Sequence, residues 1–315
     1  MPPKVFASRR FPERVRAELE SGFELDVHDS EWPPERAELL ERVAGRDGLM
    51  TMLTDRVDDE LLDAAGAQLR VVANYAVGFD NVDLEAVTRR GVIVSNTPDV
   101  LTDTVAELTM ALLLALVRRV AEGDRMIRSR QGWIWAPNLM LGRSLASLTL
   151  GLVGYGRIAR AVEERASAFG MRVIHSSRRS GIPFDELLRT ADVVSLHVPL
   201  SDETRHLIDA RALGLMKQSA FLVNTTRGPV VDEAALVRAL EKGEIAGAAL
   251  DVFEREPEVS DGLLGLENVV LAPHLGSATL ETREAMGMLC VEALRAVLLE
   301  NRLPPNALNP EAWSG

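Results

Sequence analysis

Three side chains suited to acid–base chemistry each follow a stretch that predicts a buried strand. Arg227 ends LVNTTRG, Glu256 lies in LDVFEREP, and His274 lies in APHLGSAT, between Pro273 and Gly276. The carboxyl ends of parallel strands share one edge of a sheet, and ligand crevices form outside that edge. We therefore expect these three side chains to converge there.

Together the three side chains have the chemistry that reduction of a 2-oxo acid requires. That reaction needs a cation for the carboxylate and the developing alkoxide, a proton donor, and a carboxylate that keeps the donor protonated. Arg227, His274 and Glu256 supply these in that order, so we expect all three to be catalytic, with Arg227 and His274 also binding the substrate. We expect no metal ion in this chemistry.

A glycine-rich turn, Gly154-Tyr155-Gly156-Arg157-Ile158-Ala159, follows the strand TLGLV and opens the helix RIARAVEERA. This is G-x-G-x-x-G/A in the strand–turn–helix setting that dinucleotide binding requires. The first glycine permits the tight turn, and the second lets a pyrophosphate approach the helix N-terminus. We expect the turn to bind a dinucleotide through its residues 154–158; a merely tight turn is the alternative.

The end of the next strand indicates which dinucleotide binds. An NAD-preferring enzyme usually has Asp or Glu there for the ribose 2′-hydroxyl. This chain has Ser177, Arg178 and Arg179 in VIHSSRR, and a guanidinium can bind a 2′-phosphate that a carboxylate would repel. We expect these three residues to bind the cofactor, with NADP(H) preferred and NAD(H) possible. A solvated basic turn is the alternative.

The elements that must position these residues alternate between strands and helices. Before residue 100, the runs 4–7, 24–28, 48–51, 70–74 and 92–96 predict strands, and amphipathic segments between them predict helices. A second alternation begins at residue 149 and ends in a helix from about 278 to 300. This pattern predicts an α/β fold with parallel sheets covered by helices on both faces.

Composition and charge exclude several classes of function. The chain has 315 residues, enough for two domains, and a net charge of −12. Because nucleic-acid binding requires a basic surface, we expect no such partner. The single cysteine, Cys290, fits a reducing compartment, and the apolar run ending at Val117 is too short to span a bilayer. With no signal-peptide pattern at the start, we expect a cytoplasmic protein that does not bind membranes.

Six segments in consistent order resemble the D-isomer-specific 2-hydroxyacid dehydrogenases, and most closely their glyoxylate/hydroxypyruvate reductase branch. They are VVANYAVGFDNVDLEA, GLVGYGRIARAVEERASAFGM, DVVSLHVPLSDETRHLI, LVNTTRGPVVDEAAL, AGAALDVFEREP and NVVLAPHLGSAT. The resemblance implies an NAD(P)-dependent enzyme that reduces a small 2-oxo acid to the D-2-hydroxy acid. It extends from about Leu49 to Glu300.

The resemblance also implies roles for further residues. The backbone amides of Val77 and Gly78 would hold the substrate carboxylate, and Ser277 would face the substrate. The other expected substrate-binding residues are Leu53 and Ala76. Thr104 would contact the cofactor phosphate or nicotinamide region, and Asp251 the nicotinamide amide. The remaining expected cofactor contacts are His197, Pro199 and Thr225.

The family's architecture is two Rossmann-like domains that close over the substrate. Residues 1–98, completed by 287–315, would form a discontinuous, flavodoxin-like substrate-binding domain, and residues 99–286 a doubly wound dinucleotide-binding domain. The helix LTDTVAELTMALLLALVRRV resembles the family's dimerisation arm, so we expect a homodimer. Burial within the same chain would give the same apolar pattern.

Some features of the sequence leave alternatives open. Between SSRRSG and IPFDELL the chain is shorter than the family pattern, which usually has a further strand there. The size of substrate that the site accepts would depend on Leu53, Tyr75, Trp133 and Trp135. The two tryptophans would either cap the substrate or pack within the chain. NTPDVLTDTVAELTMALLL also resembles phosphite dehydrogenase, and a corepressor-like nucleotide-sensing protein of the same fold would keep the same Arg, Glu and His.

Overall fold

The alternating strands and helices form two parallel sheets in the computed structural model, which describes residues 1–130 and 132–314. The chain divides into two compact units: unit 1 is Met1–Leu101 with Ala278–Gly315, and unit 2 is Thr102–Ser277. The expected second junction, at 286/287, lies inside a continuous helix. The contacts place that junction before the helix begins, at Ala278.

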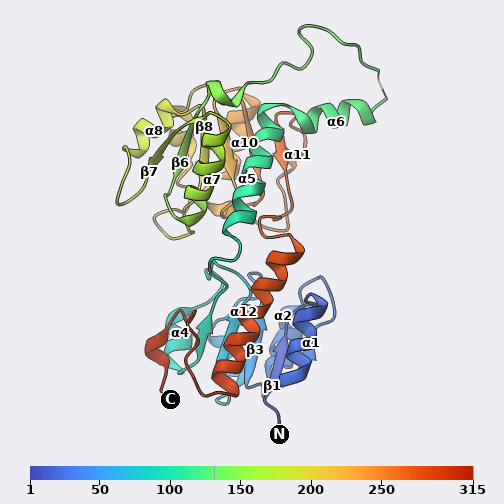
Figure 1. Cartoon of the computed structure of the whole chain (residues 1–315), viewed down its shortest axis with the longest axis vertical. Helices are drawn as coiled ribbons and strands as arrows, with labels where there is room; N and C mark the ends of the chain where they lie inside the picture. Colours follow the sequence, from blue (N-terminus) through green and yellow to red (C-terminus); the bar gives the residue numbers. More distant parts are fainter. Residues whose placement is uncertain (131, 315) are drawn as a thin grey trace. The chain divides into compact units, whose positions relative to one another are not determined.

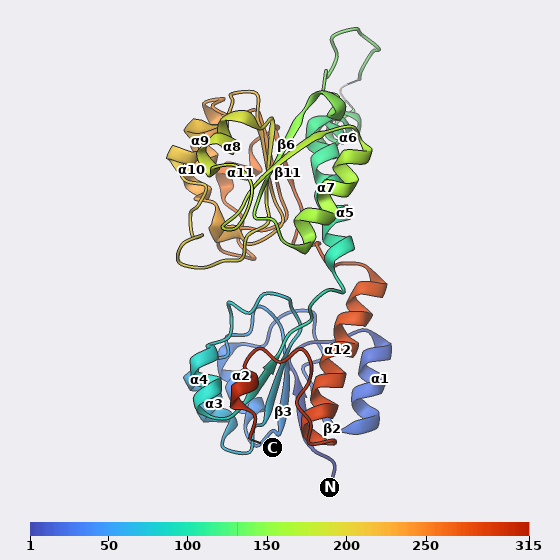
Figure 2. The ribbon, with the colours of Figure 1, turned by 60° about the vertical axis from the view of Figure 1, so that its left-hand side comes forward.

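Unit 1 contains a five-stranded parallel sheet with the order β2-β1-β3-β4-β5. Its strands are β1 (Lys4–Ala7), β2 (Glu24–Val27), β3 (Gly48–Thr51), β4 (Val71–Asn74) and β5 (Ile93–Ser95). Its helices are α1 (Glu13–Gly22), α2 (Arg36–Val43), α3 (Asp59–Ala65), α4 (Leu84–Arg89) and α12 (Leu280–Leu298), followed by a short 3₁₀ turn (Pro310–Ala312). Helices α1 and α12 cover one face and α2, α3 and α4 the other (Figure 2). The order 2-1-3-4-5 is that of the flavodoxin-like folds, as expected.

Unit 2 contains a six-stranded parallel sheet with the order β11-β10-β9-β8-β6-β7. Its strands are β6 (Thr149–Val153), β7 (Arg172–Ser176), β8 (Val193–Leu196), β9 (Phe221–Asn224), β10 (Gly247–Leu250) and β11 (Val269–Leu271). Its helices are α5 (Thr102–Val117), α6 (Val120–Arg128), α7 (Arg157–Ala168), α8 (Phe184–Thr190), α9 (Ala210–Leu215), α10 (Glu233–Glu241) and α11 (Asp261–Leu264), with 3₁₀ turns at Leu145–Ser147 and Gly228–Val230. Helices α5 and α7 pack on one face of the sheet and α8, α9 and α10 on the other (Figures 1 and 2).

The shortened segment after β7 changes the edge of this sheet. A doubly wound sheet of order 3-2-1-4-5-6 that loses its third strand has the order 2-1-3-4-5, which is the order of β7, β6, β8, β9 and β10. Strand β7 is therefore one edge strand of the sheet, and β11 is the other. The chain turns back at Ser177–Ser180, and Gly181 forms an antiparallel bridge with Ser176 before α8 begins.

Helix α5 is a core helix of unit 2. Most of its apolar residues, including Met110, Leu113 and Val117, are buried against α7 and the sheet within the same chain. Several exposed apolar side chains lie instead on α6, which buries none of its residues, and in the segment after it. Figure 1 shows α6 and residues 132–142 extending from the rest of the unit. Among the described residues, every helix is too short or too polar to cross a membrane.

Candidate active site

The carboxyl ends of three neighbouring strands of unit 2 carry the predicted catalytic residues. Arg227 follows β9, Glu256 follows β10 and His274 follows β11. The Nδ1 atom of His274 lies 2.8 Å from Oε2 of Glu256, and both side chains are about one quarter exposed. The Glu256 carboxylate also accepts a hydrogen bond from the Phe253 amide at 3.0 Å. Histidine and glutamate thus form a partly buried pair in which Glu256 fixes the orientation of the imidazole.

The protonation of Glu256 reflects its surroundings. Burial opposes ionisation of its carboxyl group, but the hydrogen bond and charge of His274, the Phe253 amide and the charge of Arg227 outweigh burial and lower its pKa. The carboxylate is therefore ionised at neutral pH and lies beside the His274 ring. The influence of Arg227 on this pKa also indicates that the predicted cation belongs to the same electrostatic cluster.

The loops that carry Arg227 and Glu256 touch through their backbones at Gly228. A Cβ atom at this position would lie 1.7 Å from the carbonyl oxygen of Phe253, so only glycine allows the approach. The side chain of Asn224, at the end of β9, donates a 3.0 Å hydrogen bond to the Arg227 carbonyl. The backbone of the arginine is therefore held from both sides.

Asp251, which we expected to contact the nicotinamide, organises the turn that carries His274. Its buried carboxylate accepts hydrogen bonds from the amides of Leu275 (2.7 Å) and Gly276 (2.9 Å), while its carbonyl accepts one from the His274 amide at 2.8 Å. Burial raises the pKa of Asp251 in spite of these donors. His274 itself has a left-handed backbone, with φ of 55°, which the turn maintains.

A second pair of acidic residues supports the Glu256 loop, and the sequence analysis missed it. The Glu254 amide donates to the Glu233 carboxylate at 3.0 Å, and the Glu233 amide donates to the Glu254 carboxylate at 3.2 Å. Nε2 of His206 lies 2.8 Å from Oε1 of Glu254. Glu233 is the first residue of α10. In the sequence, the only indication of its role is that a carboxylate in the first turn of a helix is favourably placed.

The glycine-rich turn has the shape that a dinucleotide requires. Gly154 has φ of 88°, and a Cβ atom there would lie 2.5 Å from the carbonyl oxygen of His197. A Cβ at Gly156 would enter open space, where only a residue without a side chain leaves the backbone accessible. Helix α7 begins next, at Arg157, with no side-chain cap and no acidic residue in its first turn. Its N-terminal amides and dipole suit a pyrophosphate.

Three more of the expected cofactor residues of unit 2 follow strands at the same edge of the sheet, and a fourth lies in a helix. His197 and Pro199 follow β8, Thr225 follows β9, and Thr104 lies in the first turn of α5. Burial lowers the pKa of His197 to about 4, so this ring is neutral; among the described residues its buried Nδ1 has no hydrogen-bond partner. Thr225 is buried, with its hydroxyl 2.9 Å from that of Thr109.

The turn Ser177–Ser180 presents its two arginines to solvent. The Ser177 hydroxyl closes the turn by donating to the Ser180 carbonyl at 2.9 Å and accepting from the Ser180 amide at 3.0 Å. Arg178 forms an exposed ion pair with Glu203 at 2.8 Å. Gly181 completes the turn with φ of 98°, where a Cβ would lie 2.0 Å from the His175 carbonyl oxygen.

The expected substrate residues other than those of the triad and Ser277 lie in unit 1, in loops at the carboxyl ends of β3 and β4. Leu53 follows β3, and Ala76, Val77 and Gly78 follow β4. The carbonyl oxygens of residues 76–78 accept hydrogen bonds from Thr97, Asn96 and Asn74, respectively. Within residues 1–130 and 132–314, the amides of Val77 and Gly78 donate no hydrogen bond, which leaves two N–H groups for an anion.

The structure changes two expectations about substrate size. Tyr75 is 3% exposed, with its hydroxyl donating to the Arg283 carbonyl and its ring against Phe11, so it belongs to the core of unit 1. Trp133 and Trp135 are 61% and 83% exposed, so packing within the chain does not account for them.

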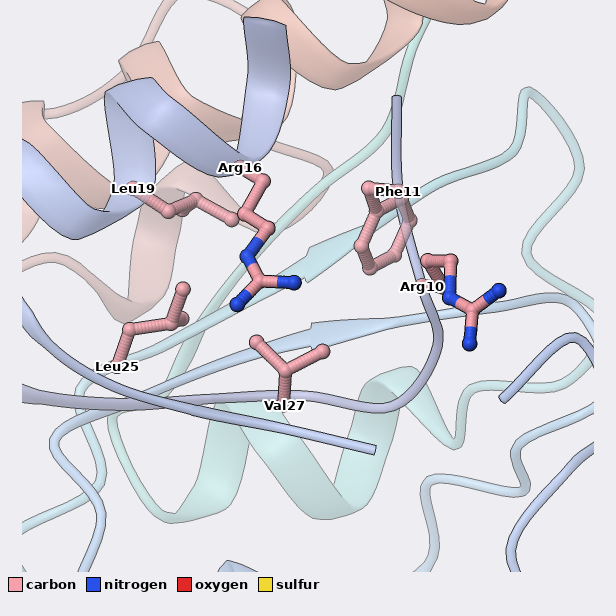
Figure 3. Close-up of a pocket in the computed structure, with 6 residues that line it drawn as sticks. All are labelled: Arg10, Phe11, Arg16, Leu19, Leu25 and Val27. Carbon is pink, nitrogen blue, oxygen red and sulfur yellow. The ribbon is translucent and has the colours of Figure 1, made fainter. Parts of the chain in front are cut away.

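A small hollow elsewhere in unit 1 contains none of the predicted residues (Figure 3). It lies between α1 and β2 and is lined by Arg10, Phe11, Arg16, Leu19, Leu25 and Val27. Its two arginines pair with Asp29 at 2.7 Å and Glu20 at 2.8 Å. The described chain therefore places its candidate chemistry at the strand ends and not in this hollow.

Known proteins are similar to this chain in sequence and fold over nearly their whole length. The family model for the NAD-binding domain of D-isomer-specific 2-hydroxyacid dehydrogenases matches residues 110–276. The glyoxylate reductase of Korarchaeum cryptofilum is 48% identical over 324 residues, covering 99% of this chain and 97% of its own. That of Thermococcus litoralis is 46% identical over 327 residues, covering 99% of this chain and 98% of its own.

Two solved structures give the same result in three dimensions. A protein from Thermus thermophilus superposes with a TM-score of 0.92 at 47% identity, covering 97% of this chain and 99% of its own. The NADPH-dependent glyoxylate/hydroxypyruvate reductase of Sinorhizobium meliloti, solved with NADP and malonate, gives 0.86 at 32% identity, covering 99% and 98%. The chain belongs to the D-isomer-specific 2-hydroxyacid dehydrogenases, a family of NAD(P)-dependent oxidoreductases.

Proposed function

We propose that this protein uses NAD(P)H to reduce glyoxylate, hydroxypyruvate or a similarly small 2-oxo acid to the D-2-hydroxy acid. The observation that carries the proposal is the 2.8 Å contact between His274 and Glu256. It lies at the edge of the sheet formed by the carboxyl ends of the strands, where Arg227 and the glycine-rich turn also lie. Relatives covered along almost their whole length are glyoxylate reductases, which supports this choice of substrate class.

Each member of the triad has one task in the mechanism. The dinucleotide, when bound at the turn 154–158, supplies the hydride. Because Nδ1 of His274 is held by Glu256, Nε2 is the nitrogen that donates the proton to the developing alkoxide. The ionised Glu256 keeps the imidazole protonated and oriented, and Arg227 stabilises the negative charge of the substrate.

Unit 1 carries further residues that we assign to the oxo acid. The amides of Val77 and Gly78 bind the substrate carboxylate, and Leu53 limits the size of the side chain. The hydrogen bonds accepted by the carbonyls of residues 76–78 support this role, because they fix the backbone around the two amides. Ser277, the last residue of unit 2, is a further residue that we assign to the substrate.

In this proposal the enzyme prefers NADPH to NADH. Strand β7 ends in Ser176, and the turn after it has two arginines and no carboxylate. The exposed Arg178 and Arg179 can rotate toward a 2′-phosphate, although Arg178 must then leave Glu203. The similar protein from Sinorhizobium meliloti is an NADPH-dependent reductase, which supports the same preference.

The proposed assembly is a homodimer formed through α6 and the segment after it. Val120, Ile127, Trp133, Ile134 and Trp135 are each more than half exposed, a concentration of apolar surface that is unusual for an isolated chain. A second copy of the chain would cover this surface. A sedimentation mass equal to one chain at micromolar concentration would contradict this part of the proposal.

A panel of 2-oxo acids assayed with NADPH and NADH tests the activity. Glyoxylate and hydroxypyruvate should oxidise the cofactor with higher kcat/KM than longer oxo acids. Oxidation of NADPH by none of these acids, with tight cofactor binding retained, would favour a nucleotide-sensing protein and remove the proposal.

Replacement of Arg227 by lysine tests the role of the guanidinium. Lysine keeps the charge but lacks the planar fork that engages a carboxylate and a carbonyl together, so both KM for the oxo acid and kcat should worsen. We expect a loss of kcat/KM of about 10² or more, equivalent to the roughly 3 kcal/mol of a charge-assisted hydrogen bond. A defect confined to cofactor affinity would contradict the assignment.

A further inference from the structure

A buried polar network lies beneath two loops of unit 1. The first loop, 52–55, follows β3 and carries Leu53; the second, 76–78, follows β4 and carries the Val77 and Gly78 amides. Asn74, the last residue of β4, is fully buried between them. Polar side chains without solvent access persist in folded proteins when their hydrogen bonds are satisfied, so the partners of Asn74 show what the network holds.

Asn81 connects the two loops through its side-chain amide. Its Nδ2 lies 2.9 Å from the Asp55 carbonyl oxygen, 3.1 Å from that of Met52 and 3.1 Å from Oδ1 of Asn74. Asn74 in turn donates to the Gly78 carbonyl at 3.1 Å and to Oδ1 of Asn81 at 3.3 Å. A two-residue chain of amides therefore ties both ends of the first loop to the second.

A buried ion pair anchors the outer side of the first loop. Arg9, which follows β1, lies 3.1 Å from the Asp55 carboxylate and donates to the Thr54 hydroxyl at 2.7 Å. The same carboxylate accepts from the Met52 amide at 2.7 Å and from the Ser8 hydroxyl. Residues on both sides of Leu53 are thus fixed by side chains outside the loop.

We propose that Asn81 is a positioning residue for the oxo acid, because it sets the spacing between Leu53 and the Val77 and Gly78 amides. The proposal rests on the proposed function, which assigns those residues to the substrate. All members of the network lie in unit 1, whereas the glycine-rich turn lies in unit 2. Loss of the network should therefore weaken binding of the oxo acid and leave binding of the dinucleotide unaffected.

The test replaces Asn81 with alanine, and with serine as a milder variant. Each change removes the amide that bridges Met52, Asp55 and Asn74. We expect KM for glyoxylate to rise about tenfold or more while kcat changes less, and oxalate, a dicarboxylate that cannot be reduced, to bind the NADPH-loaded protein about tenfold more weakly. The dissociation constant of NADPH, measured by fluorescence, should stay within twofold.

Asn309→Ala provides the matched control. Asn309 is a buried asparagine of unit 1, whereas Asn81 is half-buried; its hydrogen bonds join the Val94 amide, the Val92 carbonyl and the Thr88 hydroxyl, near the amino end of β5. It should lower Tm as Asn81→Ala does, with KM for glyoxylate and oxalate affinity unchanged.

The outcomes separate this inference from the proposed function. Lower Tm with unchanged KM and oxalate affinity in the Asn81 variants would make the network purely structural and overturn the inference alone. A wild-type protein that neither reduces 2-oxo acids nor binds oxalate would overturn the proposed function first.

Discussion

The first five strands of each unit share the order 2-1-3-4-5, but the residues that follow the first strand differ between the units. In unit 2, β6 is followed by Gly154 and Gly156, and α7 begins with neither a capping side chain nor an acidic residue. In unit 1, β1 is followed by Ser8 and the buried Arg9, and α1 begins with Glu13 in its first turn.

The difference shows that strand order alone does not create a nucleotide site. At α7 the helix dipole and bare backbone are available to an anion, whereas at α1 an acidic residue already occupies the first turn. The crevice of unit 1 is instead occupied by a guanidinium and a carboxylate that brace a loop. Substitutions at the carboxyl edge of the unit 2 sheet should therefore affect cofactor binding and turnover. Substitutions in unit 1 should affect only the binding of the oxo acid.

His274→Gln should give the largest effect, since it removes the proposed proton donor and keeps a side chain of similar size. Turnover should fall by roughly 10²- to 10⁴-fold, the contribution of a positioned general acid. Fluorescence titration with NADPH should give a nearly unchanged dissociation constant. A folded variant with near-normal turnover would remove His274 from the mechanism.

Arg178→Ala tests whether the turn after β7 distinguishes the two cofactors. A charge-assisted pair with phosphate is worth roughly 1.5–3 kcal/mol, so KM for NADPH should rise about ten- to a hundredfold while KM for NADH stays constant. Raised salt should weaken NADPH binding in the wild type more than NADH binding. A wild type that prefers NADH, together with a silent variant, would leave the arginines as a solvated turn.

Gly154→Ala tests the bare backbone of the unit 2 crevice. A left-handed residue with a Cβ costs about 1–2 kcal/mol, and this Cβ would also meet the His197 carbonyl, so the affinity for either dinucleotide should fall roughly five- to thirtyfold. Gly243→Ala is the control, because Gly243 has φ of 65° and open space around it. Equal loss of affinity in both variants would contradict a specific role for the turn.

Glu256→Gln should shift the pH dependence of reduction more than it lowers the maximal rate. The carboxylate, ionised because its pKa is depressed, stabilises the imidazolium, so its loss releases the proton at lower pH. The alkaline limb of the kcat/KM profile should move to lower pH. An alkaline limb at the wild-type position would show that Glu256 does not tune His274.

The sequence predicts the strands and the unit 2 edge well because both depend on local patterns. The apolar runs at 4–7 and 48–51 match β1 and β3, and the three residues proposed as catalytic lie just after strands, where the sequence placed them. Contacts between distant segments were harder to predict. Tyr75 lies in the core, where its hydroxyl donates to the Arg283 carbonyl, and Glu233 at the start of α10 accepts a hydrogen bond from the Glu254 amide in the loop after β10. The apolar pattern of α5 also fitted a dimer surface, yet most of it is buried within the chain.

The short turn after β7 has a consequence for the solubility of the protein. An edge strand exposes unpaired N–H and C=O groups that can recruit a strand from another molecule and begin aggregation. Here the chain folds back so that Ile182 donates to the His175 carbonyl at 2.9 Å and Gly181 bridges to Ser176, which occupies the end of that edge. The segment next to the two arginines therefore also shields the sheet from its neighbours, and loosening it to alter cofactor choice would expose a surface prone to self-association.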